Sequence, residues 1–195
     1  IIAEKWAPIA AQKTVVIDNS KFFRMDPDVP LIVPEVNPQD LKNYKKKNII
    51  ANANCSVIPL VVALKPLHDL YQIKRIVAST YQSVSGAGKA PMDELLSQTK
   101  NFFENKELSS KFFTKQIAFN AIPHIDSFLA DGYTKEEKKM HDEVKKILDT
   151  KIKITSTSVR IPVLVSHAIS VNVEFHKSYK LNEIKTVLSS SPGCK

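Results

Sequence analysis

The sequence predicts a mixed α/β protein without internal repeats, and its character changes near Asn54. Up to this residue the chain shows short extended segments, such as Thr14–Ile17 and Leu31–Val33, which are interrupted by turn-forming residues. Farther along, apolar residues recur with helical spacing and alternate with longer strand patterns. Because the first part offers strands but no helices to cover them, we expect an incomplete domain over residues 1–54. A second incomplete domain is expected over residues 55–195.

Local signals predict the individual elements. Thr134 and Glu137 form a capping box, in which the two side chains satisfy backbone N–H groups at the start of a helix. Met140, Val144, Ile147 and Leu148 supply an apolar stripe for that helix. The other elements expected are strands at Asn48–Ala51, Ile73–Tyr81, Ile152–Arg160 and Val163–Phe175, a tight corner at Ser85–Gly88, and helices after Cys55, over Met92–Phe103 and over Leu181–Leu188.

Glycine is scarce, and this scarcity excludes the common nucleotide-binding motifs. The chain has only four glycines, at positions 86, 88, 132 and 193. No arrangement of them gives the glycine fingerprint of a dinucleotide-binding loop or a P-loop. Any phosphate cradle for a nucleotide therefore lies outside these residues.

The chain carries an excess of positively charged residues, which indicates what kinds of partner it could bind. The chain has 28 Lys and Arg against 20 Asp and Glu, a formal net charge of +8. Much of the excess lies at Lys45–Lys47 and within Lys135–Lys146, without the interleaved aromatic residues that nucleic-acid-binding surfaces use. Solvated faces or a small anionic substrate remain as explanations, and no nucleic-acid partner is expected.

Nothing in the sequence predicts a membrane segment or an oxidising compartment. The longest apolar run, Val57–Leu64, is much shorter than the ~20 residues of a membrane span. The two cysteines, Cys55 and Cys194, make no disulfide framework in a chain of this length and lack the spacing of a zinc site. We therefore expect reduced thiols, no bound metal and a cytoplasmic location.

Cys55 and His167 are the first candidates for chemistry. Cys55 lies between a predicted strand and a predicted helix, where the helix N-terminus favours a thiolate. The alternative is a small buried residue at a strand end. His167 interrupts an otherwise apolar strand, where it is either the base that a cysteine nucleophile needs or a hydrogen-bonded core histidine.

Three further polar residues are candidates for the same site. Arg160 precedes the His167 strand and either binds a carboxylate or lies at the surface. Gln82 ends a strand, where its amide can orient a carbonyl or fix a turn. Arg24 follows a turn and is otherwise a solvated charge. These positions predict a Cys–His nucleophilic site with cationic neighbours, without separating thioester chemistry from a cysteine hydrolase.

Several strings resemble the aspartate-semialdehyde dehydrogenase family, especially its bacterial members. They occur in the family's order over nearly the whole chain, at Val16–Ser20, Phe23–Asn37, Asn54–Ser56, Ser79–Gly88, Gly132–Met140 and Val159–Val163 with His167.

The resemblance implies a role for each matching residue. Cys55 would be the nucleophile, His167 the general acid/base and Gln82 the amide that positions substrate and acyl intermediate. Arg160 would bind the carboxylate of the substrate and Glu136 its amine, and Asn54 would also contact the substrate. Arg24 and Lys139 would bind phosphate. The cofactor would be bound by Ser85, Gly86 and Ala87. Lys139 is preferred to Lys138 because it directly precedes Met140.

The resemblance also implies a fold and an activity. The fold would be the remnant of a Rossmann-type NADP-binding domain, followed by a mixed-sheet catalytic and dimerisation domain like the C-terminal domain of glyceraldehyde-3-phosphate dehydrogenase. The reaction would be the NADPH-dependent reduction of L-aspartyl-4-phosphate to L-aspartate 4-semialdehyde and phosphate, in lysine, methionine, threonine and diaminopimelate biosynthesis. A cytoplasmic homodimer is expected.

The chain departs from the family pattern at a few positions. Ala53 stands where the family usually has proline, Ser166 where it often has glycine, and Ile169 where it usually has an acidic or amide residue. The family's N-terminal glycine-rich loop and C-terminal segment are missing, so we expect an internal fragment that is inactive alone. The alternatives are another acyl-phosphate reductase, such as N-acetyl-glutamyl-phosphate reductase, or an inactive anion-binding fragment.

Overall fold

The computed structural model describes residues 2–194, which divide into two compact units. Unit 1 comprises residues 2–76, 139–154 and 173–194, and unit 2 comprises residues 77–138 and 155–172. Each unit contains both helices and strands, as the predicted α/β class requires. Within residues 2–194, no helix is long and apolar enough to cross a membrane.

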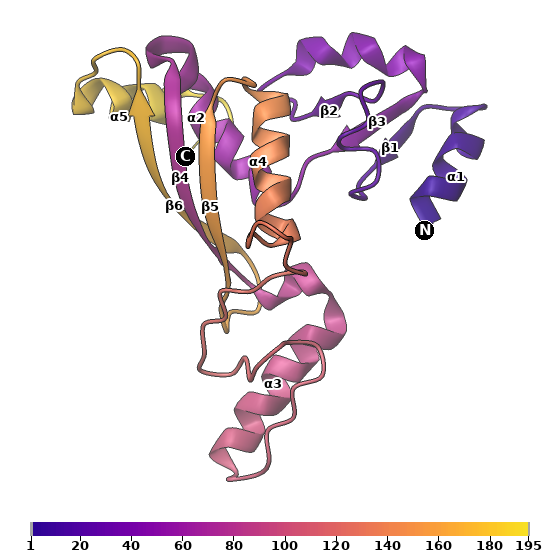
Figure 1. Ribbon diagram of the computed structural model, residues 1–195, viewed down its shortest axis with the longest axis vertical. Coiled ribbons are helices and arrows are strands. Elements are labelled where there is room, and N and C mark those ends of the chain that lie inside the picture. The colour runs from indigo at the N-terminus through magenta and orange to yellow at the C-terminus, as the bar shows by residue number, and fades with distance from the viewer. Residues whose placement is uncertain (1, 195) are drawn as a thin grey trace. The chain divides into compact units, whose positions relative to one another are not determined.

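Unit 1 contains a small parallel sheet with the strand order β1-β3-β2. The strands are β1 (Val16–Asp18), β2 (Leu31–Ile32) and β3 (Ile49–Asn52), and Ile50 of the central strand pairs with Ile17. Figure 1 shows that α1 (Ile2–Ala11) lies next to β1, which it contacts. All three strands lie where the sequence predicted short extended segments.

The prediction that the first part of the chain lacks helices is wrong. Besides α1, the 3₁₀ helix η1 covers Pro38–Lys46. Pro8 lies inside α1, where proline removes a backbone hydrogen bond and therefore argues against a helix. The buried Ala7 and Ala11, one turn apart, provide the packing that overrides this penalty.

Two helices of unit 1 pack against each other, α2 (Val57–Tyr71) and α5 (Leu181–Ser190). The helix predicted after Cys55 is confirmed, and its apolar residues with helical spacing, Val57, Leu60, Val61, Leu64 and Leu67, are all buried. Pro59 lies in the first turn of α2, where a missing N–H group costs nothing.

The second sheet has the order β5-β4-β6, with β4 at Ile73–Gln82, β5 at Lys153–Arg160 and β6 at His167–Phe175. The predicted start of the last strand at Val163 is wrong. Ser166 has φ +79°, a left-handed conformation that breaks the strand directly before His167. The residues before it form a loop, in which the Val163 carbonyl accepts a hydrogen bond from the Val84 N–H group at 2.9 Å.

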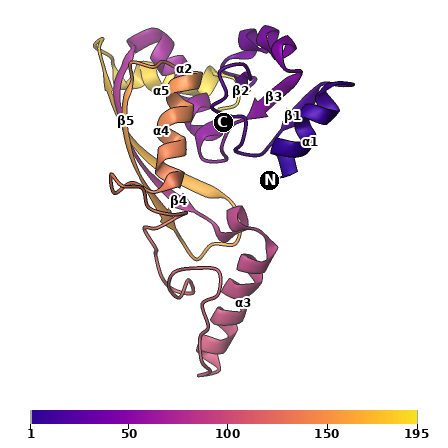
Figure 2. The ribbon, with the colours of Figure 1, turned by 45° about the vertical axis from the view of Figure 1, so that its right-hand side comes forward.

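In unit 2, α3 (Lys89–Phe103) and the segment after it are held together by side chains of the helix. The Oε1 atom of Gln98 accepts backbone hydrogen bonds from Ile117 (2.9 Å) and Ala118 (3.1 Å). Figure 2 shows this segment running along α3. The short helix η2 (Val84–Ala87) precedes α3 at the predicted corner, and its Val84 belongs to a core cluster with Leu95.

The capping box at the start of α4 (Lys135–Ile147) is confirmed in both directions. The Glu137 N–H group donates to the Thr134 hydroxyl at 3.3 Å, and the Thr134 N–H group donates to Glu137 Oε2 at 2.7 Å. The other oxygen of Glu137 accepts the backbone N–H of Ser158 at 2.9 Å. The cap therefore also ties the helix start to β5.

We expect Thr134→Ala to lower the free energy of unfolding of the full-length protein by about 1 kcal/mol, because one helix N–H group loses its acceptor. Urea denaturation followed by circular dichroism measures the change. Thr134→Ser, which keeps the hydroxyl, should retain most of the stability. Equal midpoints for the wild type and Thr134→Ala would contradict the role of this cap.

Candidate functional site

The predicted site residues fall into two groups, one in each unit. Unit 1 holds Arg24, Asn54, Cys55 and Lys139, whereas unit 2 holds Gln82, Ser85, Gly86, Ala87, Glu136, Arg160 and His167. The predicted pairing of Cys55 with His167 joins the two units and stays a prediction.

Cys55 lies directly before α2, in the turn that follows β3. Its side chain is exposed, so the interpretation as a small buried residue is wrong. The Sγ atom lies 3.9 Å from Asn54 Oδ1, which also accepts the Ser56 N–H at 2.8 Å. The Asn54 carbonyl accepts the N–H groups of Val57 and Ile58 at 2.9 and 3.0 Å. Asn54 thus caps the helix and leaves the thiol at its positive end.

Arg24 is buried, with 8% of its surface exposed, so the interpretation as a solvated charge is wrong. Its Nε donates to the Asn52 carbonyl at 2.8 Å, Nη1 to Glu143 Oε1 at 3.1 Å and Nη2 to the Asn19 carbonyl at 3.3 Å. A guanidinium has five N–H groups, so two remain to donate to an anion. Lys139 lies one turn before Glu143 on α4, on the same helix face.

Sequence reasoning missed Glu143 and Lys146 of α4. The Lys146 ammonium donates to the carbonyls of Arg24, Asp26 and Val29 at 2.7, 2.8 and 3.0 Å, and so ties the Arg24 loop to the helix. Burial lowers the pKa of Lys146, while Asp26 and Glu143 act in the opposite direction. A signal was present for Glu143, because this acidic residue lies within the apolar stripe of α4.

In unit 2, Ser83 contacts the Nδ1 atom of the His167 ring. Its Nδ1 accepts the backbone N–H of Ser83 at 3.1 Å and lies 3.2 Å from the Ser83 hydroxyl, which in turn lies 2.9 Å from the Ser85 hydroxyl. Since Nδ1 accepts, the neutral ring carries its proton on Nε2. The side chain is half-buried and bonded to a backbone N–H group, which fits both the predicted base and a hydrogen-bonded core histidine, so the role of His167 stays a prediction.

Ser83 also holds Arg160. The Arg160 Nη1 atom donates to the Ser83 carbonyl at 2.6 Å, and the residue is buried at 7% exposure, so it is not a surface arginine. A Cβ atom on Gly86 would lie 3.5 Å from Arg160 Nη1 and 3.6 Å from His167 Nε2. His167, Arg160 and Gly86 are thus neighbours. Sequence reasoning missed Ser83, because its main contacts are made by backbone atoms that any residue carries.

Gln82 and Glu136 form a further polar contact in unit 2. The Gln82 amide nitrogen lies 3.2 Å from Thr80 Oγ1 and 3.4 Å from Glu136 Oε1. Both residues are buried, with exposures of 2% and 8%. The Gln82 carbonyl accepts the Ile161 N–H at 3.0 Å, which fixes the strand end. Unit 2 therefore brings a carboxylate, an amide, a guanidinium and an imidazole to the Gln82–Ser83 segment.

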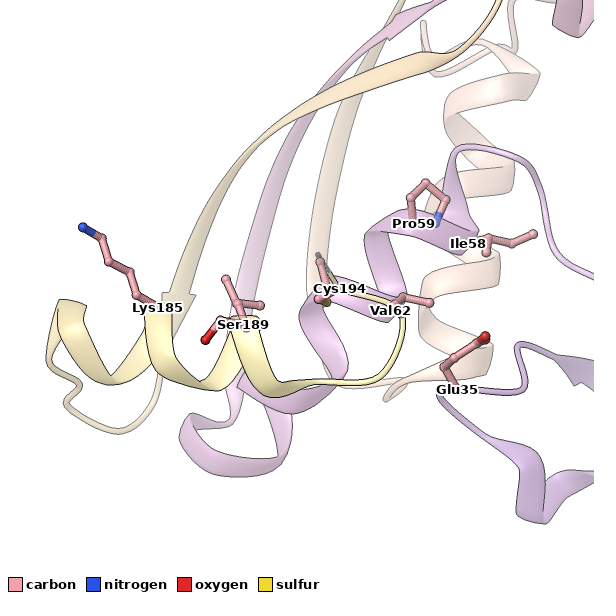
Figure 3. Close-up of a pocket in the computed structure, with 10 residues that line it drawn as sticks. Glu35, Ile58, Pro59, Val62, Lys185, Ser189 and Cys194 are labelled. Carbon is pink, nitrogen blue, oxygen red and sulfur yellow. The ribbon is translucent and has the colours of Figure 1, made fainter.

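A cavity of about 750 Å³ lies elsewhere in unit 1, between α2 and α5. Figure 3 shows Cys194 beside Val62 of α2, with Ser189 and Lys185 on α5. Among the described residues that line this cavity, none is a predicted site residue. Cys194 is half-buried there, in contrast to Cys55.

Of the predicted cofactor residues Ser85, Gly86 and Ala87, Gly86 lies next to His167. Their contact with a cofactor stays a prediction. Among residues 2–194, no group of His, Cys, Asp and Glu is arranged to hold a metal ion.

Family models match both parts of the chain. The model described as "Semialdehyde dehydrogenase, dimerisation domain" matches residues 64–195. The chain belongs to the semialdehyde dehydrogenase family. The model described as "Semialdehyde dehydrogenase, NAD binding domain" matches residues 1–44. The predicted α/β fold class is confirmed, whereas the domain boundary between residues 54 and 55 stays a prediction.

Relatives within this family have a more specific name. The chain is 55% identical over 194 residues to the aspartate-semialdehyde dehydrogenase of Aquifex aeolicus, covering 98% of this chain and 57% of the relative. A crystal structure of aspartate semialdehyde dehydrogenase II from Vibrio cholerae, complexed with ASA, is 48% identical to this chain with a TM-score of 0.97. The match covers 98% of this chain and 58% of that one.

A more distant structure, the aspartate semialdehyde dehydrogenase with NADP from Candida albicans, is 25% identical with a TM-score of 0.70, covering 96% of this chain and 51% of that one. The predicted family resemblance is confirmed. The chain spans little more than half the length of these relatives.

We expect iodoacetamide to modify Cys55 of the full-length protein faster than Cys194, by roughly tenfold, because an exposed thiol at a helix N-terminus is the more reactive one. Peptide mass spectrometry at several time points gives both rates. Cys55→Ser should leave the Cys194 rate unchanged. Faster labelling of Cys194 would contradict the assignment of Cys55 as the nucleophile.

Proposed function

We propose that the full-length protein is an aspartate-semialdehyde dehydrogenase, which reduces L-aspartyl-4-phosphate to L-aspartate 4-semialdehyde and phosphate. The observation that carries this proposal is the contact of Gln82 with the Glu136 carboxylate, next to the contact of Ser83 with the Arg160 guanidinium. A substrate with a free amino group and a carboxylate needs both charges. The names of the similar enzymes support the same activity.

The charged groups of Glu136 and Arg160, which contact Gln82 and Ser83, also favour aspartyl over acetylglutamyl substrates. Arg160 binds the α-carboxylate, since a guanidinium donates two parallel hydrogen bonds to a carboxylate. Glu136 binds the α-ammonium group. An N-acetylated substrate has no ammonium group, and a buried carboxylate facing its amide would lack a counter-charge. N-acetyl-glutamyl-phosphate reductase activity is therefore the weaker alternative.

Cys55 supplies the nucleophile in unit 1. Its thiolate attacks the acyl carbon, so that a C–S bond forms and the bond to phosphate oxygen breaks. Asn54 holds the turn that carries Cys55 and contacts the substrate. Arg24 and Lys139 bind the leaving phosphate and offset its charge. Such an anion site explains part of the net charge of +8.

His167 assists the second half of the reaction. NADPH, when bound, supplies the hydride that reduces the thioester carbon. The Nε2–H group of His167 donates a hydrogen bond to the oxygen of the resulting tetrahedral thiohemiacetal while that oxygen carries negative charge, and the ring keeps its proton as the C–S bond breaks and the aldehyde and the Cys55 thiolate form. Gln82 orients the acyl carbonyl during both steps. The Ser83 N–H group keeps the ring in the tautomer that this role needs.

The cofactor, assembly and location follow from the same proposal. We expect NADP rather than NAD, with Ser85, Gly86 and Ala87 contacting its nicotinamide end and most of its site formed by other residues of the full-length protein. The match to a dimerisation domain supports a homodimer. A thiolate nucleophile needs a reducing environment, so the cytoplasm is the expected location.

We expect the same substitution, arginine to lysine, to have opposite effects at the two anion sites. In the full-length enzyme, Arg160→Lys should raise the KM for aspartate semialdehyde roughly 10- to 100-fold with little change for phosphate, because lysine cannot make a two-bonded carboxylate contact. Arg24→Lys should raise the KM for phosphate by a similar factor and spare the semialdehyde. Lysine keeps a positive charge beside Glu143, which limits the loss of stability.

Initial rates of NADPH formation at varied semialdehyde and phosphate concentrations separate the two constants. Lys47→Arg, a change at an exposed ion pair, serves as the control and should alter neither. Equal effects on both substrates in both variants would show that the two sites are wrongly assigned.

A further inference from the structure

Glu143 is a buried carboxylate that bonds two separate segments of unit 1. It lies on α4 with only 1% of its surface exposed. Its Oε1 accepts a hydrogen bond from Arg24 Nη1 at 3.1 Å, and its Oε2 accepts the backbone N–H of Asn54 at 2.6 Å. The two partners lie 119 and 89 residues away along the chain.

Each partner of Glu143 adjoins a different reacting group. Arg24 is held at three points, and its remaining N–H groups can donate to an anion. Asn54 caps α2 and directly precedes Cys55, so holding its N–H group fixes the peptide that leads into the nucleophile. The bond between Arg24 and Asn52 strengthens the same arrangement from β3.

The contacts of Glu143 with Arg24 and Asn54 need two acceptor atoms at this position. Both partners are donors, so both oxygens at position 143 must be acceptors. An amide there would turn an NH₂ group toward either the guanidinium or the Asn54 N–H group. A buried ion pair is by itself weak evidence for a stabilising role, because apolar residues often replace such pairs without loss of stability. The pairing of these two particular segments points to the active site.

We propose that Glu143 is a positioning residue that fixes the phosphate-binding Arg24 relative to the Cys55 nucleophile. The proposal rests on the proposed function, since it takes Arg24 as a phosphate ligand and Cys55 as the attacking thiol. Each oxygen of Glu143 contacts the protein, so the side chain acts through Arg24 and Asn54. It makes the phosphate site and the nucleophile turn one rigid arrangement, so phosphate binding and thiol reactivity depend on the same side chain.

The test uses the full-length enzyme and inorganic phosphate as the probe. In the wild type, phosphate should protect Cys55 from iodoacetamide, and the half-protecting concentration measures binding independently of turnover. In Glu143→Gln we expect this concentration and the KM for phosphate to rise roughly 10- to 100-fold, with a change of less than about threefold in the KM for the semialdehyde. The unprotected alkylation rate of Cys55 should also change.

Two further variants separate a positioning role from a general loss of stability. Asp69→Asn makes the same carboxylate-to-amide change at an exposed ion pair on α2 and should behave as the wild type. Glu143→Asp keeps the charge on a shorter side chain, so it should retain the fold and show a smaller rise in the same two phosphate constants. If Glu143→Gln does not fold, the phosphate constants of Glu143→Asp provide the test.

The outcomes distinguish this proposal from the proposed function. A folded Glu143→Gln or Glu143→Asp enzyme with wild-type phosphate protection and KM would overturn the positioning role while the wild-type activity stands. A wild-type enzyme without phosphate-dependent oxidation of aspartate semialdehyde would instead overturn the proposed function itself.

Discussion

A helix needs acceptors for its first N–H groups, and Asn54 supplies them for α2. The proposed nucleophile depends on this cap, because Cys55 lies in the capped turn and its Sγ lies 3.9 Å from the capping oxygen. The cap is in turn held by Glu143, whose other oxygen holds Arg24. A chain of hydrogen bonds therefore runs from a helix terminus to a cation that can bind phosphate.

The same principle organises unit 2, where backbone atoms rather than a carboxylate make the connection. Ser83 offers its N–H group to His167 and its carbonyl to Arg160, and the adjoining Gln82 lies against Glu136. A strand end fixes the direction of these groups because neighbouring backbone pairs lock it. In both units, backbone groups at or just after the end of a strand therefore help to orient predicted site residues, Arg24 and Cys55 in unit 1 and His167 and Arg160 in unit 2.

Much of the fold could be predicted from sequence, because local signals agreed with packing. The capping box at Thr134 and the apolar stripe of α2 are short-range patterns, and both are confirmed. α1 was missed because Pro8 opposes the helix that the buried face of Ala7 stabilises. The early break before β6 was missed because Ser166 adopts φ +79°, a conformation usual for glycine.

The types of residue in the candidate site could be predicted from the sequence. The residues that hold them in place could not, since contacts such as that of Glu143 with Arg24 join residues far apart in the chain.

The proposed function requires that Cys55 forms an acyl intermediate. The full-length enzyme, mixed with aspartate semialdehyde and NADP without phosphate, should form NADPH in a burst that approaches one equivalent per active site. Mass spectrometry should find the aspartyl group on the Cys55 peptide. NADPH formation at a steady rate without a burst, with Cys55 unmodified, would contradict the account.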